Sequence, residues 1–348
     1  MRTLEWDAEH NELRLIDQRL LPGKFQIMTC RDHSSVVRAI REMVVRGAPA
    51  IGATAAFGMA LAGCEQSTRD LPTFRAALKQ AAAALKASRP TAVNLEWALR
   101  QMLAIVDGPS ESVEAMQQRL IETAQWIAEE DVKTNKRMAE CGAALIDDGD
   151  TLIHHCNTGA LAAVDWGTAL GVIRMAHEQG KRIHVLVDET RPRLQGARLT
   201  AWELQQYGIP YEIISDGASG YFLRSGQAQK VFFGADRVAA NGDVVNKIGT
   251  YMLSLAANAN GVPVYAVMPT STVDLSMPDG DHIPIEERDS AEVLQIEVQG
   301  QRVTPAGAKA RNPAFDITPH SLITALVTEK GVVYPPFQQN LDRIMRSV

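Results

Sequence analysis

The sequence predicts an α/β protein in two parts: a mainly helical N-terminal domain with a small β element, and a C-terminal doubly wound parallel sheet. Helical segments dominate the chain up to residue 146. From residue 148 onward, short apolar runs alternate with helical segments, which is typical of βαβ units. A length of 348 residues suits two domains. We expect the first domain to cover residues 1–130 and the second to cover residues 131–348.

The N-terminal domain opens with two short strand-like runs, at residues 13–17 and 25–28. Asp32 then offers a cap for an amphipathic helix. The segment 50–61 is small, apolar and uncharged, which predicts a helix buried on all sides. Three further helical stretches follow, at residues 73–87, 92–106 and 111–146.

The C-terminal domain carries five short apolar runs that we expect to be strands, at residues 151–153, 183–187, 211–214, 230–233 and 262–267. Three helical segments are expected between or after them, at residues 164–178, 195–207 and 247–257. Ligands bind at the carboxyl ends of the strands in sheets of this kind. Polar or reactive residues directly follow four of the strands, at residues 154–159, 188–192, 215–217 and 234–237. These four strand ends are therefore the candidate site.

Cys156 follows the first of these strands and precedes a glycine-containing turn that leads to a helix. Helix N-terminal amides and nearby cations would favour its thiolate. Position alone leaves a small buried residue as an equally good interpretation. The other three cysteines, Cys30, Cys64 and Cys141, are interpreted as core residues.

Asp236 directly follows the very apolar run 231–235, so we expect partial desolvation to raise its pKa toward that of a general acid. An aspartate that caps the next turn is the alternative. Asn246 and Lys247 are expected to open a helix, where amides and an ammonium group can hold an anion.

Arg46, Gly47 and Ala48 stand immediately before the apolar helix at 50–61, with Pro49 suited to its first turn. A guanidinium group beside two backbone amides is a plausible phosphate cradle. A plain helix–helix turn with a surface arginine is the alternative.

Composition argues against several classes of protein. Acidic residues outnumber basic ones, 41 to 35, which disfavours a nucleic-acid surface. The sequence has no Gly-x-Gly-x-x-Gly or Walker A pattern, and its cysteines form no zinc or disulfide framework. His154 and His155 show no metal-ligand spacing and are interpreted either as packing at a strand end or as residues that support neighbouring site residues. We expect neither a signal peptide nor a membrane span, and hence a cytoplasmic protein. Because no metal-ligand spacing occurs, we also expect no bound metal.

Taken together, six segments resemble the methylthioribose-1-phosphate isomerases, the aldose-ketose isomerases of methionine salvage. That family belongs with the α, β and δ regulatory subunits of the translation initiation factor eIF-2B. The matching segments are residues 46–52 (Arg-Gly-Ala-Pro-Ala-Ile-Gly), 155–161, 188–192 with 195–196, 234–238, 246–250 and 283–289 (Ile-Pro-Ile-Glu-Glu-Arg-Asp). Each segment is weak alone, but the ordered set is specific.

The resemblance implies a Rossmann-like C-terminal domain without a nucleotide, no cofactor, and usually a homodimer. It implies conversion of 5-methylthioribose 1-phosphate to 5-methylthioribulose 1-phosphate, with Cys156 and Asp236 as the catalytic pair. The positions that match substrate-binding residues of the family are Arg46, Gly47, Ala48, Arg89, Gln195, Asn246 and Lys247. Such a site is expected in the cleft between the two domains.

Two other functions fit parts of this pattern. Ribose-1,5-bisphosphate isomerase is expected to share the cysteine and the aspartate, although the forms of residues 46–52 and 283–289 favour the methylthioribose enzyme. A regulatory subunit of the initiation-factor type would need neither catalytic side chain. The sequence does not distinguish an enediol route from a direct hydride shift.

Overall fold

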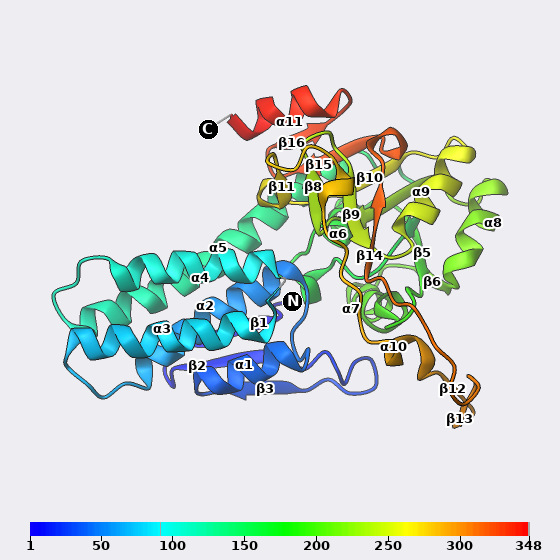
Figure 1. Cartoon of the computed structure of the whole chain (residues 1–348). Coiled ribbons are helices and arrows are strands. Elements are labelled where there is room, and N and C mark those ends of the chain that lie inside the picture. The colour runs from blue at the N-terminus through cyan, green and yellow to red at the C-terminus, as the bar shows by residue number, and fades with distance from the viewer. Residues whose placement is uncertain (91, 347–348) are drawn as a thin grey trace. The chain divides into compact units, whose positions relative to one another are not determined.

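The chain is described by a computed structural model over residues 1–90 and 92–346. It forms two compact units. The helical unit comprises Met1–Lys136 together with Thr158–Gly167, and the sheet unit comprises Arg137–Asn157 together with the chain from Thr168 onward. The mainly helical first part and the mostly parallel sheet of the second confirm the predicted fold class (Figure 1).

The helical unit begins with an antiparallel sheet in the order β1-β2-β3, with β1 (Leu4–Asp7), β2 (Glu12–Ile16) and β3 (Ile27–Cys30). Its helices are α1 (His33–Arg41), α2 (Ala48–Cys64), α3 (Leu71–Ser88), α4 (Val93–Asp107) and α5 (Val113–Ala143), the last of which continues into the sheet unit. The predicted strands and helices are confirmed, and β1 is an additional strand.

Helix α2 forms the centre of the helical unit. Every residue from Ala50 to Gly63 is buried, because small and apolar side chains allow neighbours to approach on all sides. Helix α1 lies against β3, and α2 against β1 (Figure 1). Phe74 and Leu78 of α3 are fully buried in the same core.

The segment Thr158–Gly167 is attached to the helical unit by hydrogen bonds from residues near the start of the chain. The Thr3 hydroxyl donates to the carbonyl oxygen of Ala160 at 2.5 Å, and the Gln18 amide nitrogen donates to that of Leu161 at 2.7 Å. The chain therefore returns to the helical unit directly after Asn157.

The sheet unit contains, within its described residues, a seven-stranded sheet in the order β16-β15-β10-β7-β4-β5-β6. Its strands are β4 (Thr151–His154), β5 (His184–Asp188), β6 (Tyr211–Ile214), β7 (Lys230–Gly234), β10 (Val264–Val267), β15 (Ala325–Thr328) and β16 (Gly331–Val333). Only the β15–β16 pair is antiparallel among the pairs of this sheet that the structure describes. All residues of β7 and β10 are buried, as expected for parallel strands covered on both faces.

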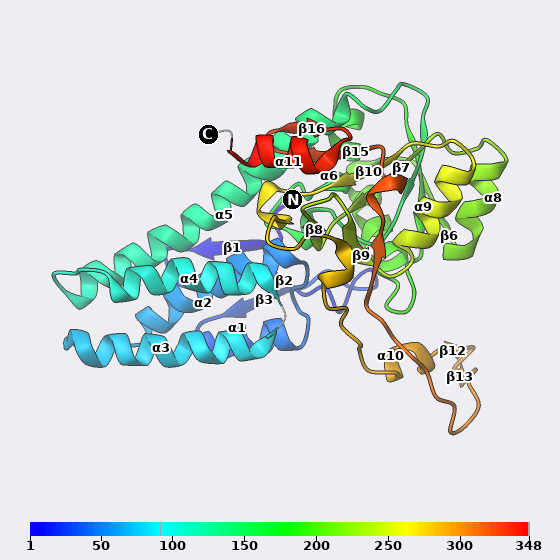
Figure 2. The same ribbon diagram turned by 45° about the horizontal axis from the view of Figure 1, so that its top comes forward.

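The α-helices described in this unit beyond α5 are α6 (Ala169–Glu178), α7 (Ala201–Tyr207), α8 (Ser219–Arg224), α9 (Thr250–Ala259), α10 (Ala291–Leu294) and α11 (Phe337–Arg346). Helices α8 and α9 lie side by side (Figure 2). The helix predicted at 195–207 divides into a π-helical turn, Gly196–Thr200, and α7.

A smaller sheet adds a feature that the sequence analysis did not predict. Its order is β11-β8-β9-β14, with β8 (Arg237–Ala239), β9 (Val244–Lys247), β11 (Val273–Asp274) and β14 (Phe315–Thr318). A two-stranded hairpin, β12 (Glu297–Val298) and β13 (Gln301–Arg302), lies between β11 and β14 in the sequence. The prediction that Asn246 and Lys247 open a helix is wrong, because both residues belong to β9 and α9 begins at Thr250.

Candidate active site

The strand order places β4 and β7 next to each other in the middle of the large sheet. From β4 the chain builds outward to β5 and β6 on one side, and it then continues at β7 on the other side. This reversal is a topological switch point, where the loops after two neighbouring strands diverge and leave room for a ligand. Cys156 follows β4 and Asp236 follows β7, so both predicted catalytic residues belong to this switch point.

Cys156 is 7% exposed and adopts a φ of 66°, in the left-handed region that few non-glycine residues occupy. Its N–H donates to the Thr190 hydroxyl oxygen at 2.9 Å, and its carbonyl oxygen accepts from the Thr200 hydroxyl at 2.7 Å. Unusual backbone conformations of this kind cluster at active sites.

Asp236 lies between β7 and β8 with an exposed side chain. The burial on which the predicted desolvation of this carboxyl group depends is therefore not observed. Its backbone N–H donates to the carbonyl oxygen of Val245 at 2.8 Å, which fixes the turn against β9. Asp236 is thereby held as an exposed residue directly after β7.

Lys247 is buried at the end of β9, where it pairs with Phe315 of β14. Its ammonium group donates to the carbonyl oxygen of Ala314 at 2.8 Å and stands 4.2 Å from the centre of the Phe315 ring. Burial, together with the charge of Arg288, lowers the pKa of Lys247 to about 8. The negative charges that Cys156 and Asp236 carry when ionised oppose this shift. Both groups are therefore within electrostatic range of the Lys247 ammonium.

Two other residues predicted to bind substrate, Asn246 and Gln195, also lie in the sheet unit. The Asn246 amide nitrogen is buried and donates to the Thr250 hydroxyl at 3.0 Å. Gln195, directly before the π-helical turn, has a buried Oε1 with no hydrogen-bond partner among the described residues. A buried carbonyl without a donor is costly, so this oxygen is available to a ligand hydroxyl.

His155 joins the ends of three elements. Its Nδ1 lies 2.8 Å from an Asp188 carboxylate oxygen, and its Nε2 lies 2.9 Å from the carbonyl oxygen of Ile248. Because a carbonyl oxygen only accepts, Nε2 carries a proton. Burial alone would lower the pKa of His155, but the Asp188 hydrogen bond and the charges of Asp188 and Asp216 raise it above its ordinary value.

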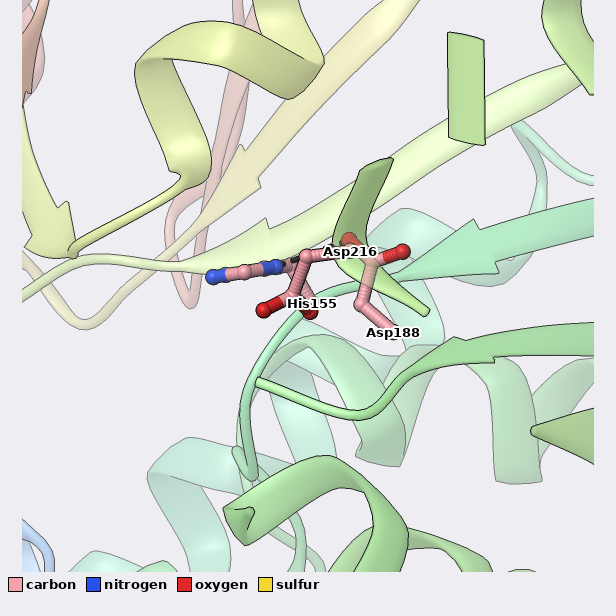
Figure 3. A group of neighbouring side chains, drawn as sticks. All are labelled: His155, Asp188 and Asp216. Atoms are coloured by element: carbon pink, nitrogen blue, oxygen red, sulfur yellow. Dashed lines mark hydrogen bonds and ion pairs between the residues drawn. The ribbon is translucent and has the colours of Figure 1, made fainter. Parts of the chain in front are cut away.

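His155, Asp188 and Asp216 also form a possible metal-ligand group, with one atom from each within 4.8 Å of the others (Figure 3). The two Asp216 oxygens, however, accept from the N–H groups of Thr190 at 2.7 Å and Arg191 at 2.8 Å. A metal ion on His155 would have to replace its hydrogen bond to Asp188, because the other ring nitrogen already donates to the Ile248 carbonyl oxygen. We therefore interpret the group as a structural hydrogen-bond network. The sequence places its members at three of the four candidate strand ends, but no local pattern encodes the hydrogen bonds between them.

The remaining predicted residues belong to the helical unit. Gly47 precedes α2 with a φ of 98°, and a Cβ at this position would stand 2.3 Å from the carbonyl oxygen of Ala162. Only glycine fits there. Arg46 and Ala48 adjoin it, so a guanidinium group and the first amides of a long helix occur together, and Arg46 Nε donates to the Gln18 side-chain oxygen at 3.4 Å. Arg89 directly follows α3 and is half-buried.

Comparisons with known proteins agree on the family. The model of the initiation factor 2 subunit family matches residues 44–335. A methylthioribose-1-phosphate isomerase from Synechococcus sp. is 52% identical over 344 residues, which cover 99% of this chain and 98% of the relative. The structure of 5-methylthioribose 1-phosphate isomerase from Pyrococcus horikoshii has a TM-score of 0.92 at 40% identity and covers 99% of this chain and 95% of that one.

A structure described as the delta subunit of the translation initiation factor eIF-2B from A. fulgidus is also similar. Its TM-score is 0.90 at 42% identity, with all of both chains covered. Among the described residues, the helices are too short or too polar to cross a membrane.

Proposed function

The chain belongs to the methylthioribose-1-phosphate isomerases of the initiation factor 2 subunit family, and we propose that Cys156 and Asp236 carry out its reaction. This reaction converts 5-methylthioribose 1-phosphate to 5-methylthioribulose 1-phosphate in methionine salvage. The observation that carries the proposal is the position of the two residues after neighbouring strands at the switch point, with Lys247 in electrostatic range of both.

The substrate carries its phosphate on the anomeric carbon, so its ring must open while the phosphate remains attached. Bound substrate covers Asp236 and thereby favours its protonated form, which gives a proton to the ring oxygen as the bond from that oxygen to C1 breaks. The hydrogen on C2 then moves to C1, either directly as a hydride or through Cys156 as a proton. Loss of the C2 hydroxyl proton completes the ketone and restores the Asp236 acid, so no atom or electron is gained overall.

Lys247 is proposed to offset the phosphate charge. A buried ammonium group binds an anion more strongly than an exposed one, since little water competes with it. Asn246 and Gln195 would complete the polar contacts from the sheet unit. Arg46, Gly47, Ala48 and Arg89 are proposed as further substrate-binding residues because they match the family positions.

We also propose that the protein works in the cytoplasm as a homodimer. Its four cysteines are all free thiols, as a reducing compartment requires. Sedimentation of the purified chain at several concentrations would measure its oligomeric state.

The function is tested by incubating the purified chain with 5-methylthioribose 1-phosphate and following the ketose by NMR. We expect turnover without an added cofactor, and a kcat/KM for this substrate well above that for ribose 1,5-bisphosphate. Equal or higher kcat/KM for the bisphosphate would identify the other isomerase. Absence of turnover on both would contradict the proposal.

A regulatory subunit is the second candidate function, because the similar A. fulgidus structure is described as an initiation-factor subunit. We expect such a subunit to act only in a complex with other kinds of subunit. A stable homo-oligomer with full isomerase activity in the absence of other proteins would exclude that requirement.

A further inference from the structure

Cys156 depends on its surroundings for its backbone conformation. Strand β4 ends at His154, and the chain reaches Asn157 through a cysteine in the left-handed region, with a φ of 66°. An L-residue with a Cβ is disfavoured there, so neighbouring groups must hold the conformation. The direction of the thiol is thereby fixed by the backbone and not only by the side-chain rotamer.

Two buried threonine hydroxyls bond to the peptide groups on either side of Cys156. The Cys156 N–H donates to Thr190 Oγ1 at 2.9 Å, and Thr200 Oγ1 donates to the Cys156 carbonyl oxygen at 2.7 Å. Both threonines are fully buried. Both peptide groups that flank the cysteine are therefore bonded to side chains, one from the loop after β5 and one from the π-helical turn.

Thr190 is itself fixed by the loop after β5. Its hydroxyl donates to the Asp188 carbonyl oxygen at 3.0 Å, and its N–H donates to an Asp216 carboxylate oxygen at 2.7 Å. Thr190 also adopts a left-handed conformation, with a φ of 63°. Two residues with unfavourable backbone conformations, on neighbouring strand ends, thus hold each other by one hydrogen bond.

Thr200 is fixed by the π-helical turn Gly196–Thr200. Its hydroxyl accepts from the Asn157 amide nitrogen at 3.1 Å, so it contacts both Cys156 and the next residue. A Cβ on Gly196 would stand 1.7 Å from the Asp188 carbonyl oxygen, which shows how closely this turn approaches the loop after β5. The π-helical turn is of a kind that recurs at functional sites.

We propose that Thr190 and Thr200 are positioning residues, whose hydroxyls hold the Cys156 backbone so that the thiol faces the reacting carbons. This inference rests on the proposed role of Cys156. The two threonines bond the peptide groups of Cys156 and leave the substrate to other residues. Their removal should therefore slow the chemical step while substrate binding persists.

The test replaces each hydroxyl by a methyl group, as Thr190→Val and Thr200→Val, and restores it by Thr190→Ser and Thr200→Ser. The matched control is Thr328→Val, because the buried Thr328 hydroxyl likewise donates to a carbonyl oxygen and accepts from a backbone N–H, at a turn on the edge of the same sheet. The measurements are kcat, KM, the melting temperature and the rate of Cys156 alkylation by iodoacetamide.

We expect each valine variant to lower kcat about 10- to 100-fold with KM changed less than about threefold, since a small displacement of a reacting group has effects of this size. The serine variants should recover most of kcat, and the alkylation rate of Cys156 should change only in the valine variants. If a valine variant does not fold, the smaller Thr190→Ala or Thr200→Ala substitution provides the same measurement.

Two results would overturn the inference: kcat values of the valine variants equal to that of Thr328→Val, or losses of kcat that only follow the melting temperature and that serine does not restore. Failure of the proposed function itself would look different. In that case Cys156→Ser would keep full activity, whatever the threonine variants do.

Discussion

Replacing the buried Lys247 by methionine should make the chain more stable and less active. Burial and the charge of Arg288 lower the pKa of Lys247 from its ordinary value of 10.5 to about 8. Each pKa unit corresponds to about 1.4 kcal/mol, so the folded chain at pH 7 holds an ammonium group that costs about 3 kcal/mol. Loss of the hydrogen bond to the Ala314 carbonyl oxygen offsets about 1 kcal/mol of the gain. The expected net increase in the free energy of unfolding is about 2 kcal/mol.

The pH dependence gives this prediction a sign that can be checked. Between pH 8 and 10.5 the folded chain has lost the Lys247 proton, whereas the unfolded chain still binds it. Wild-type stability therefore gains from this group as pH rises through that window, because the unfolded state binds more protons. The advantage of Lys247→Met is full at pH 7 and disappears by the upper end of the window.

The assay is urea unfolding followed by far-ultraviolet circular dichroism, at pH 7 and pH 10, in a buffer free of phosphate. Phosphate must be absent because a bound anion would stabilise the wild type alone. Lys230→Met is the contrasting control in the same unit. Burial would lower the pKa of Lys230, but hydrogen bonds with Asp147 and Asp150 raise it, so this substitution should destabilise the chain at pH 7. A Lys247→Met variant that is less stable than wild type at pH 7, or equally shifted at both pH values, would refute the reasoning.

Three further predictions concern single groups. Gly47→Ala should lower the free energy of unfolding by about 2 kcal/mol or more, because Gly47 has a φ of 98° and a Cβ there would collide with the backbone of Ala162. Thermal unfolding measures this change, and an unchanged melting temperature would contradict the geometry. The KM for the sugar phosphate should rise as pH increases above 8, since Lys247 then loses its charge before substrate binds, and a KM that is constant up to pH 10 would exclude this role. Gln195→Leu should raise KM about tenfold or more, because the proposed contact of its Oε1 with the substrate is lost. Thermal stability should not fall, because this buried oxygen has no partner in the described part of the chain. An unchanged KM would argue against a substrate contact.

Local sequence patterns predicted the elements that depend on their own composition. Helix α2 was predictable because every residue from Ala50 to Gly63 is small or apolar, and β7 because it is a short uninterrupted apolar run. The strand ends were predictable as candidate sites because βαβ connections bring them to one edge. These predictions needed no knowledge of which strands are neighbours.

The errors concern residues whose environment comes from distant parts of the chain. Lys247 was expected to open a helix, but it is a strand residue because it pairs with Phe315 of β14, far along the sequence. Asp236 was expected to be partly desolvated because it follows an apolar strand, yet it is exposed in the turn between β7 and β8. The contacts of Thr190 and Thr200 with Cys156 likewise depend on three loops meeting, which no local pattern encodes.

The most direct measurement for the whole account is the rate of ketose formation from 5-methylthioribose 1-phosphate by wild type, Cys156→Ser and Asp236→Asn. Cys64→Ser and Asp281→Asn, both at exposed positions outside the proposed site, serve as matched controls. We predict that the two controls keep the wild-type rate and that the two site variants lose about a thousandfold or more, since each removes a proton-transfer or charge-stabilising group. Wild-type rates in Cys156→Ser and Asp236→Asn would contradict the assignment of the reaction to the switch point between β4 and β7.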